Sequence, residues 1–104
     1  MAVINVTKDN FNEVIEKGAI ILDFWAPWCG PCRMLGPVLE QLSNEENITI
    51  GKVNVDEEDL LAEKFGISSI PALFLVRDGK IVNKAVGYMQ LAQLKEFIKW
   101  FMMQ

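Results

Sequence analysis

The chain has 104 residues, 51% of them hydrophobic, and a formal net charge of −4 at pH 7. This length predicts one domain, residues 1–104, with enough apolar side chains for a core of its own. The acidic balance argues against a nucleic acid partner, because no basic excess is present to displace counterions from phosphates. With no apolar run of 18 residues and no leader-like start, we expect a soluble, cytoplasmic protein without membrane association.

The chain opens with a strand, a helix and a second strand. Residues 3–6 predict a short strand, and residues 11–15 predict a helix with one apolar face that Gly18 ends. The run Ala19–Trp25 is almost continuously apolar, which is typical of a strand buried on both faces. Asp23 is the one charged residue in this run, and an unpaired buried carboxylate is costly. Asp23 is therefore a candidate for a catalytic role.

The only two cysteines of the chain follow this strand in Trp28-Cys29-Gly30-Pro31-Cys32. Thiols at these two positions can meet if the first lies at a helix start and the second in its first turn. A stabilising role fits poorly, because a disulfide that closes about four residues restrains the unfolded chain by only ~2 kcal/mol, against ~5 kcal/mol for about 100 residues. Dithiol chemistry is the leading interpretation, and metal ligation or an incidental pair are the alternatives.

The middle of the chain predicts a helix, a strand and another helix. Apolar residues at helical spacing continue from the cysteines to about Asn44, and Pro37 should bend this helix. Residues 48–55 alternate like a strand. The acidic run at residues 56–59 is expected to be the first turn of the next helix, where negative charge suits the helix dipole.

The last third predicts a hairpin and a final helix. Asp78-Gly79 lies between two apolar runs, which favours an antiparallel hairpin. Apolar residues then recur at helical spacing from Leu91 to Phe101, with Met102-Met103 as expected core filler. The order βαβαβαββα predicts an α/β fold with a central mixed five-stranded sheet flanked by four helices.

In open sheets of this kind, functional residues gather where a strand ends and the chain enters a helix. Cys29 lies at such a point, between the run Ala19–Trp25 and the following helix. Helix amides directed at its sulfur would favour the thiolate, which is the species that attacks disulfides. We therefore expect Cys29 to be the exposed nucleophile, and Cys32, one turn inside the helix, to be covered and to act second.

The segment from Asp23 to Met34 resembles the active-site segment of the thioredoxin family. Its Cys29-Gly30-Pro31-Cys32 motif is similar to that of thioredoxins, whereas glutaredoxins and disulfide isomerases carry other residues between the cysteines. Ile70-Pro71 falls where the family has a cis proline, and the likeness extends over essentially the whole chain. The resemblance implies the thioredoxin fold and a general protein disulfide reductase that acts as a monomer.

The resemblance also implies roles for individual residues. Cys29 would attack, Cys32 would resolve, and Asp23 would assist proton transfer for Cys32. The redox potential would be tuned by Gly30, Pro31 and Lys52. A flat apolar surface for substrate docking would be formed by Trp28, Ser69, Ile70, Pro71, Val86 and Gly87. This chain departs from the frequent family residues at Arg33, Ser68-Ser69 and Ala72, which affects docking and potential rather than the basic chemistry.

The implied partners are proteins with disulfides and a separate thioredoxin reductase, linked to NADPH or to ferredoxin. No cofactor is expected in the chain itself, since it contains no Gly-x-Gly-x-x-Gly motif for a nicotinamide or flavin. A zinc site would need ligands from a second subunit, because the chain has two cysteines and no histidine. The alternative function is a binding module that uses the apolar surface around Trp28 and Pro71 without turnover.

Overall fold

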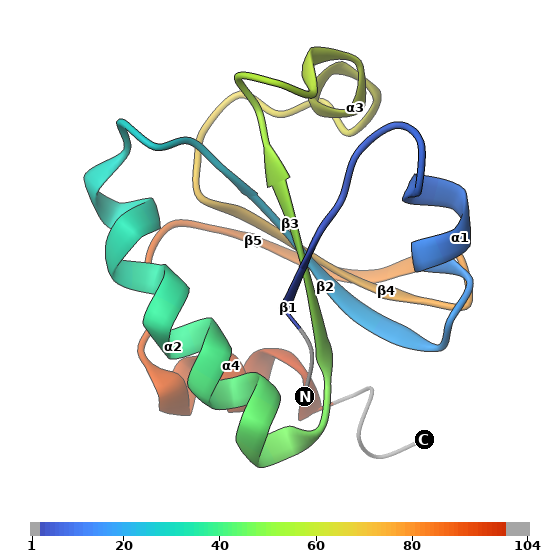
Figure 1. Cartoon of the computed structure of the whole chain (residues 1–104). Helices are drawn as coiled ribbons and strands as arrows, with labels where there is room; N and C mark the ends of the chain where they lie inside the picture. The colour runs from blue at the N-terminus through green and yellow to red at the C-terminus, as the bar shows by residue number, and fades with distance from the viewer. Residues whose placement is uncertain (1–2, 100–104) are drawn as a thin grey trace.

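The computed structural model describes residues 3–99, which form a mixed β-sheet with helices on both faces (Figure 1). The elements in chain order are β1 (Val3–Asn5), α1 (Phe11–Ile15), β2 (Ala19–Trp25), α2 (Gly30–Glu46), β3 (Thr49–Asn54), α3 (Asp59–Lys64), β4 (Ala72–Arg77), β5 (Lys80–Val86) and α4 (Leu91–Phe97). The sheet order is β1-β3-β2-β4-β5. Strands β1, β3 and β2 are parallel, and β4 is antiparallel to both of its neighbours. The predicted fold class, element order and mixed sheet are confirmed within the described residues.

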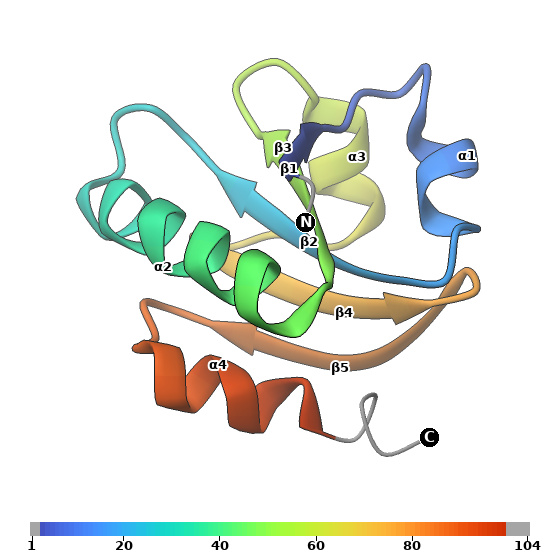
Figure 2. The same cartoon turned by 60° about the horizontal axis from the view of Figure 1, so that its bottom comes forward.

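Two apolar layers enclose the sheet, with α2 and α4 on one face and α1 and α3 on the other (Figure 2). Successive residues of β2 alternate between them: Ile21 packs in the layer of α2 and α4, whereas Leu22 and Phe24 pack in the layer of α1 and α3. All three side chains are fully buried. This burial on both faces explains why the run is apolar without the alternation of a half-exposed strand.

The acidic run at residues 56–59 is not the first helical turn that the sequence predicts. Helix α3 begins only at Asp59, and the residues before it form a turn after β3. The Asn54 side chain accepts a hydrogen bond from the backbone N–H of Asp56 at 2.9 Å, which favours the turn over a helix. The Asp56 carboxylate is consequently left for another partner.

The helix after the cysteines begins at Gly30, with Cys29 before it and Cys32 in its first turn as predicted, and it continues through Pro37 to Glu46, beyond the predicted end at about Asn44. At the other end of the chain, α4 ends at Phe97. The predicted helical position Phe101 and the predicted core filler Met102-Met103 lie outside the described residues. None of the described helices has the length and apolar character needed to cross a bilayer.

The sheet register brings two distant segments to the same edge. Phe24 near the end of β2 pairs with Ala72 at the start of β4, which runs antiparallel to it. The loop that enters α2 and the segment before β4 therefore lie side by side. These segments contain the two cysteines and Ile70-Pro71.

Candidate active site

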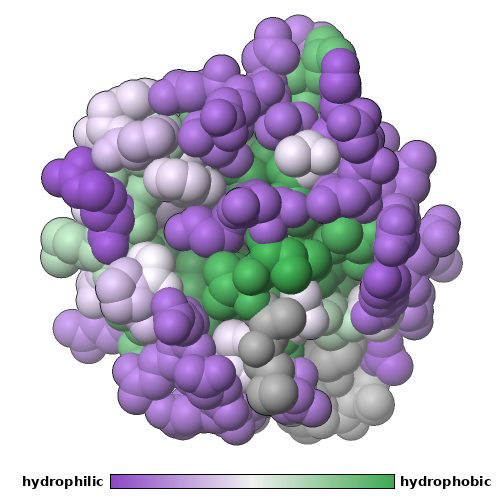
Figure 3. Space-filling model, viewed as in Figure 1, coloured by the Kyte–Doolittle hydropathy of each residue, from purple (hydrophilic) through white to green (hydrophobic). Residues whose placement is uncertain are grey.

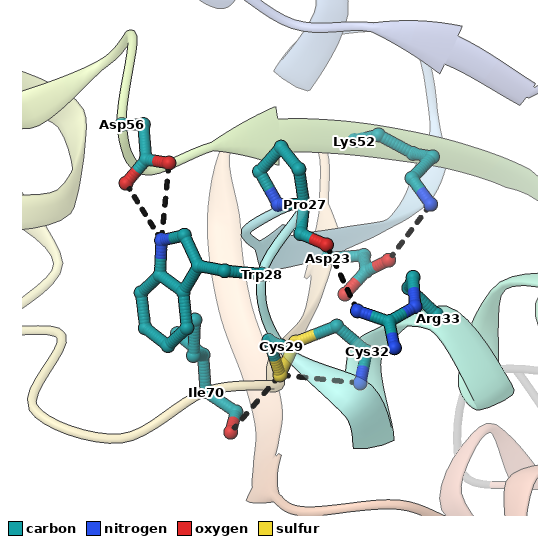
Figure 4. The surroundings of a disulfide bond; sticks show 9 residues. All are labelled: Asp23, Pro27, Trp28, Cys29, Cys32, Arg33, Lys52, Asp56 and Ile70. Carbon is teal, nitrogen blue, oxygen red and sulfur yellow. Dashed lines mark hydrogen bonds and ion pairs between the residues drawn. A yellow bond between two sulfur atoms is a disulfide. The ribbon is translucent and has the colours of Figure 1, made fainter.

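Cys29 is the N-cap of α2, and it is joined to Cys32 by a disulfide with a Cα–Cα distance of 5.2 Å. Its backbone is extended (φ −91°, ψ 112°), and its sulfur accepts the backbone N–H of Cys32 at 3.2 Å (Figure 4). Pro31 lies in the first turn, where a missing N–H removes no helical hydrogen bond. When the disulfide is reduced, the same N–H and the helix dipole would stabilise a thiolate on Cys29.

Both cysteines are buried, which corrects the expectation of an exposed Cys29. The exposed fraction is 6% for Cys29 and 2% for Cys32, so the predicted order holds while the predicted exposure does not. The reason is a small apolar cluster that the two cysteines form with the fully buried Ala26, against which Trp25 and Ile70 pack. A substrate can therefore reach Cys29 only with close surface contact.

Trp28 stands beside the disulfide with 68% of its surface exposed. Its indole N–H donates to both carboxylate oxygens of Asp56, at 3.2 and 3.1 Å (Figure 4). Sequence reasoning missed Asp56, because its partner lies 28 residues away and its acidic neighbours suggested a helix start. No local signal marks the contact, which depends on the turn after β3 lying next to the loop before α2.

The segment before β4 faces the disulfide from the other side. The Ile70-Pro71 peptide bond is cis, as the resemblance implies, and the Ile70 carbonyl oxygen lies 3.9 Å from the Cys29 sulfur. Gly87 donates its backbone N–H to the Pro71 carbonyl at 2.8 Å and has a φ of +102°, which glycine adopts most readily. Ser69 and Val86 are both exposed next to them. The structure thus brings the predicted docking residues to one edge.

Asp23 lies within β2, fully buried, opposite Lys52 of β3 in the parallel register. The Lys52 ammonium is 3.6 Å from a carboxylate oxygen, so the two form an ion pair without a hydrogen bond. Burial raises the pKa of Asp23 to about 6, and the charge of Lys52 opposes that rise. The carboxylate would therefore gain and lose a proton close to neutral pH.

Lys52 also contacts the aromatic ring of Trp25, with its nitrogen 4.6 Å from the ring centre. Beside it, a cavity of about 340 Å³ is lined by both Lys52 and Cys32. Arg33 contacts the loop that precedes α2, where its guanidinium donates to the Pro27 carbonyl at 3.0 Å (Figure 4). In the part of the chain that the structure describes, no cluster of three or more potential metal-binding side chains occurs.

A sequence profile described as Thioredoxin matches residues 2–100. The chain belongs to the thioredoxin family. Among its relatives, a thioredoxin of Bacillus subtilis (strain 168) is 41% identical over 100 residues, which cover 94% of this chain and 96% of that protein. A thioredoxin of Chlamydia caviae is 52% identical over 83 residues, which cover 79% and 81% of the two chains.

A solved structure supports the same assignment of the fold. A mutant thioredoxin from Halobacterium salinarum NRC-1 superposes with a TM-score of 0.90 at 33% identity, covering 96% of this chain and 90% of that one. The thioredoxin fold predicted from the motif is therefore confirmed. Thioredoxins are disulfide oxidoreductases, and this family member has the Cys29–Cys32 disulfide that the chemistry requires. The alternative of a binding module without turnover is not favoured.

Proposed function

We propose that Cys29 is the attacking residue of a protein disulfide reductase and that Cys32 is the resolving residue. The Cys29 thiolate attacks one sulfur of a substrate disulfide, forms a mixed disulfide and releases the other substrate sulfur as a thiolate. Cys32 then loses its proton and attacks the Cys29 sulfur, which releases the second substrate thiolate. The substrate gains two electrons and two protons, and the Cys29–Cys32 disulfide remains.

The position of the Cys29 sulfur at the start of α2 is the observation that carries this assignment. That sulfur already accepts the Cys32 N–H at 3.2 Å, whereas Cys32 lies within the first turn and is the less exposed of the two. A helix start stabilises negative charge on the sulfur nearest to it. Cys29 is therefore the residue whose thiolate the helix start would stabilise on reduction, and Gly30 and Pro31 between the cysteines would tune the redox potential.

Asp23 is proposed as the group that receives the proton of Cys32. With burial raising its pKa to about 6, the carboxylate is largely ionised at neutral pH and can still be protonated at small cost. Lys52 tunes this balance, since its charge opposes the rise. Cys32 and Lys52 line one cavity, which would give water access to this side of the site, whereas Asp23 is not among its lining residues.

The proposed partners are proteins that contain disulfides and a separate thioredoxin reductase, which uses NADPH or ferredoxin to restore the dithiol. Substrates would dock on the surface formed by Trp28, Ser69, Ile70, Pro71, Val86 and Gly87. The exposed Trp28 ring and the backbone of Ile70 near the sulfur support this placement. We further propose that the protein works as a monomer in the cytoplasm, where a reductase keeps thiols reduced.

Reduction of insulin disulfides in the presence of dithiothreitol tests the proposal. The protein should accelerate insulin precipitation, with or without a metal chelator, and Cys29→Ser should not. Activity that survives Cys29→Ser, or that the chelator removes, would contradict the assignment. Recycling with NADPH and a reductase, compared with reduced ferredoxin and its reductase, would identify the electron donor.

A further inference from the structure

Among residues 3–99, no helix covers one face of the edge strand β5. On the other face, α4 lies along the strand, where the Asn83 side chain donates to the Phe97 carbonyl at 3.1 Å. On the uncovered side α1 and α3 stand over the middle of the sheet and do not extend across β5 (Figure 2). Ile81 and Val86 are consequently 53% and 65% exposed, although both are large apolar residues.

A groove runs along this uncovered face. Two cavities of about 600 and 310 Å³ adjoin one another, since both are lined by Phe65, Phe74 and Lys84, and we call the two together the β5 groove. Its floor is aromatic, with the rings of Phe65 and Phe74 5.0 Å apart. Along β5 the groove extends from Ile81 to Val86, which pair with Val76 and Ala72 of β4 across a bulge in β5, and at about 3.3 Å per residue these four steps of β4 correspond to roughly 13 Å. An extended segment of about five residues would fill it.

The charge of the groove is opposite to that of the chain. The chain carries −4 overall, but no acidic residue of the described chain lines either cavity, whereas Lys64 lines the larger one and Lys84 lines both. The Lys64 ammonium lies 4.8 Å from the centre of the Phe11 ring. Within residues 3–99 neither lysine pairs with a carboxylate. An occupant with a carboxylate would supply the missing partner.

One end of the groove joins the proposed docking surface, because Ser69 and Val86 line the groove and also flank the Ile70-Pro71 segment beside Cys29. We propose that the β5 groove binds an extended segment of the substrate protein, about five residues long, that carries large apolar side chains and at least one carboxylate. The inference rests on the proposed reductase function and specifies which disulfide proteins it prefers. Figure 3 shows an apolar area near the centre of one face of the molecule with polar residues around it, so exposed apolar surface alone does not single out the β5 groove; its two lysines and the lack of acidic residues among its described lining do.

Three synthetic peptides test the groove directly. Each contains one cysteine in a mixed disulfide with 2-thiopyridine, and next to it a five-residue flank in which two residue types alternate. The flank of the first peptide alternates leucine with glutamate, that of the second alternates leucine with lysine, and that of the third alternates serine with glutamate. Flanks on either side of the cysteine are made separately. Attack by reduced protein joins Cys29 to the peptide sulfur and releases thiopyridone, whose absorbance gives the second-order rate constant in stopped flow.

The leucine–glutamate peptide should react about fivefold faster than the other two, because each new ion pair and apolar contact at the surface contributes up to about a factor of five. Lys84→Glu should abolish this preference and favour the lysine peptide, and Val82→Asp should slow both leucine peptides. Lys8→Glu is the matched control, since Lys8 is exposed and lines neither cavity. Uncharged dithiodipyridine, which has no flank, should react equally with all variants.

Equal rates for the three peptides would overturn the groove and leave the reductase function intact. Failure of every peptide and of dithiodipyridine to react would overturn the proposed function itself, and the groove with it. Sedimentation of the protein alone should show a monomer. A dimer that Val82→Asp dissociates would assign the groove to a second copy of the chain and contradict the proposal.

Discussion

Replacing Asp23 with asparagine should stabilise the protein at pH 8 and change its stability little at pH 4. Burial raises the pKa of Asp23 from 3.8 to about 6 in the folded protein. At about 1.4 kcal/mol for each pH unit between the two values, the ionised carboxylate costs the folded state about 3 kcal/mol. Below 3.8 the carboxyl is protonated in both states and the cost is absent; it grows between 3.8 and about 6 and is complete above that range. Asparagine stays neutral throughout.

Urea unfolding of the oxidised protein at the two pH values measures this difference. The free energy of unfolding of Asp23→Asn should exceed that of the parent by up to about 3 kcal/mol at pH 8, and the two should agree at pH 4. Asp9→Asn is the control, because it removes the same charge from an exposed position. A variant that is no more stable than the parent at pH 8 would refute the idea that buried charge on Asp23 destabilises the fold.

Three further changes probe the surroundings of the site. Gly51→Ala should destabilise the protein by roughly 1–3 kcal/mol in urea unfolding, because a Cβ at that position would lie 2.8 Å from two buried methyl groups; unchanged stability would contradict the packing. Asp56→Ala removes the acceptor of the Trp28 indole, so the Trp28 indole N–H should exchange faster with water in NMR spectra, at a cost in stability of about 1 kcal/mol or less. Lys52→Met removes the charge that opposes the rise in the pKa of Asp23, so that pKa should move above about 6 in a carbon NMR titration, and a lower value would contradict the ion pair.

Local patterns predict most of the fold. The apolar run of β2 has the predicted bounds, and β4 and β5 form the predicted antiparallel hairpin, because burial on two faces and an Asp-Gly turn leave clear signals in the sequence. The start of α2 follows from the spacing of the two cysteines rather than from a usual capping residue, since its cap is a cysteine and not a hydroxyl or carboxylate residue. The acidic run at residues 56–59 was predicted to be the first turn of α3, and this was wrong because acidic residues suit a loop turn as well as a first helical turn.

The sequence predicts part of the site, and it does not predict contacts between residues that are far apart along the chain. The cysteine spacing identifies the redox pair, and the anomaly of a charge in an apolar strand identifies Asp23. The residues around Asp23 in the sequence include no basic partner for it, and its contact with Lys52 follows from the parallel register of β2 and β3. Neither the residue pattern nor the family resemblance predicts the contact of Asp56 with Trp28, because it joins two loops that are far apart in the sequence.

Mass spectrometry of trapped intermediates tests the central claim, that Cys29 attacks and Cys32 resolves. The reduced single variants Cys32→Ser and Cys29→Ser are each mixed with a disulfide-containing protein, quenched with acid and digested. The account predicts a stable mixed disulfide between Cys29 and the substrate in Cys32→Ser, and little or none in Cys29→Ser. A mixed disulfide that forms at Cys32 as readily as at Cys29 would contradict it.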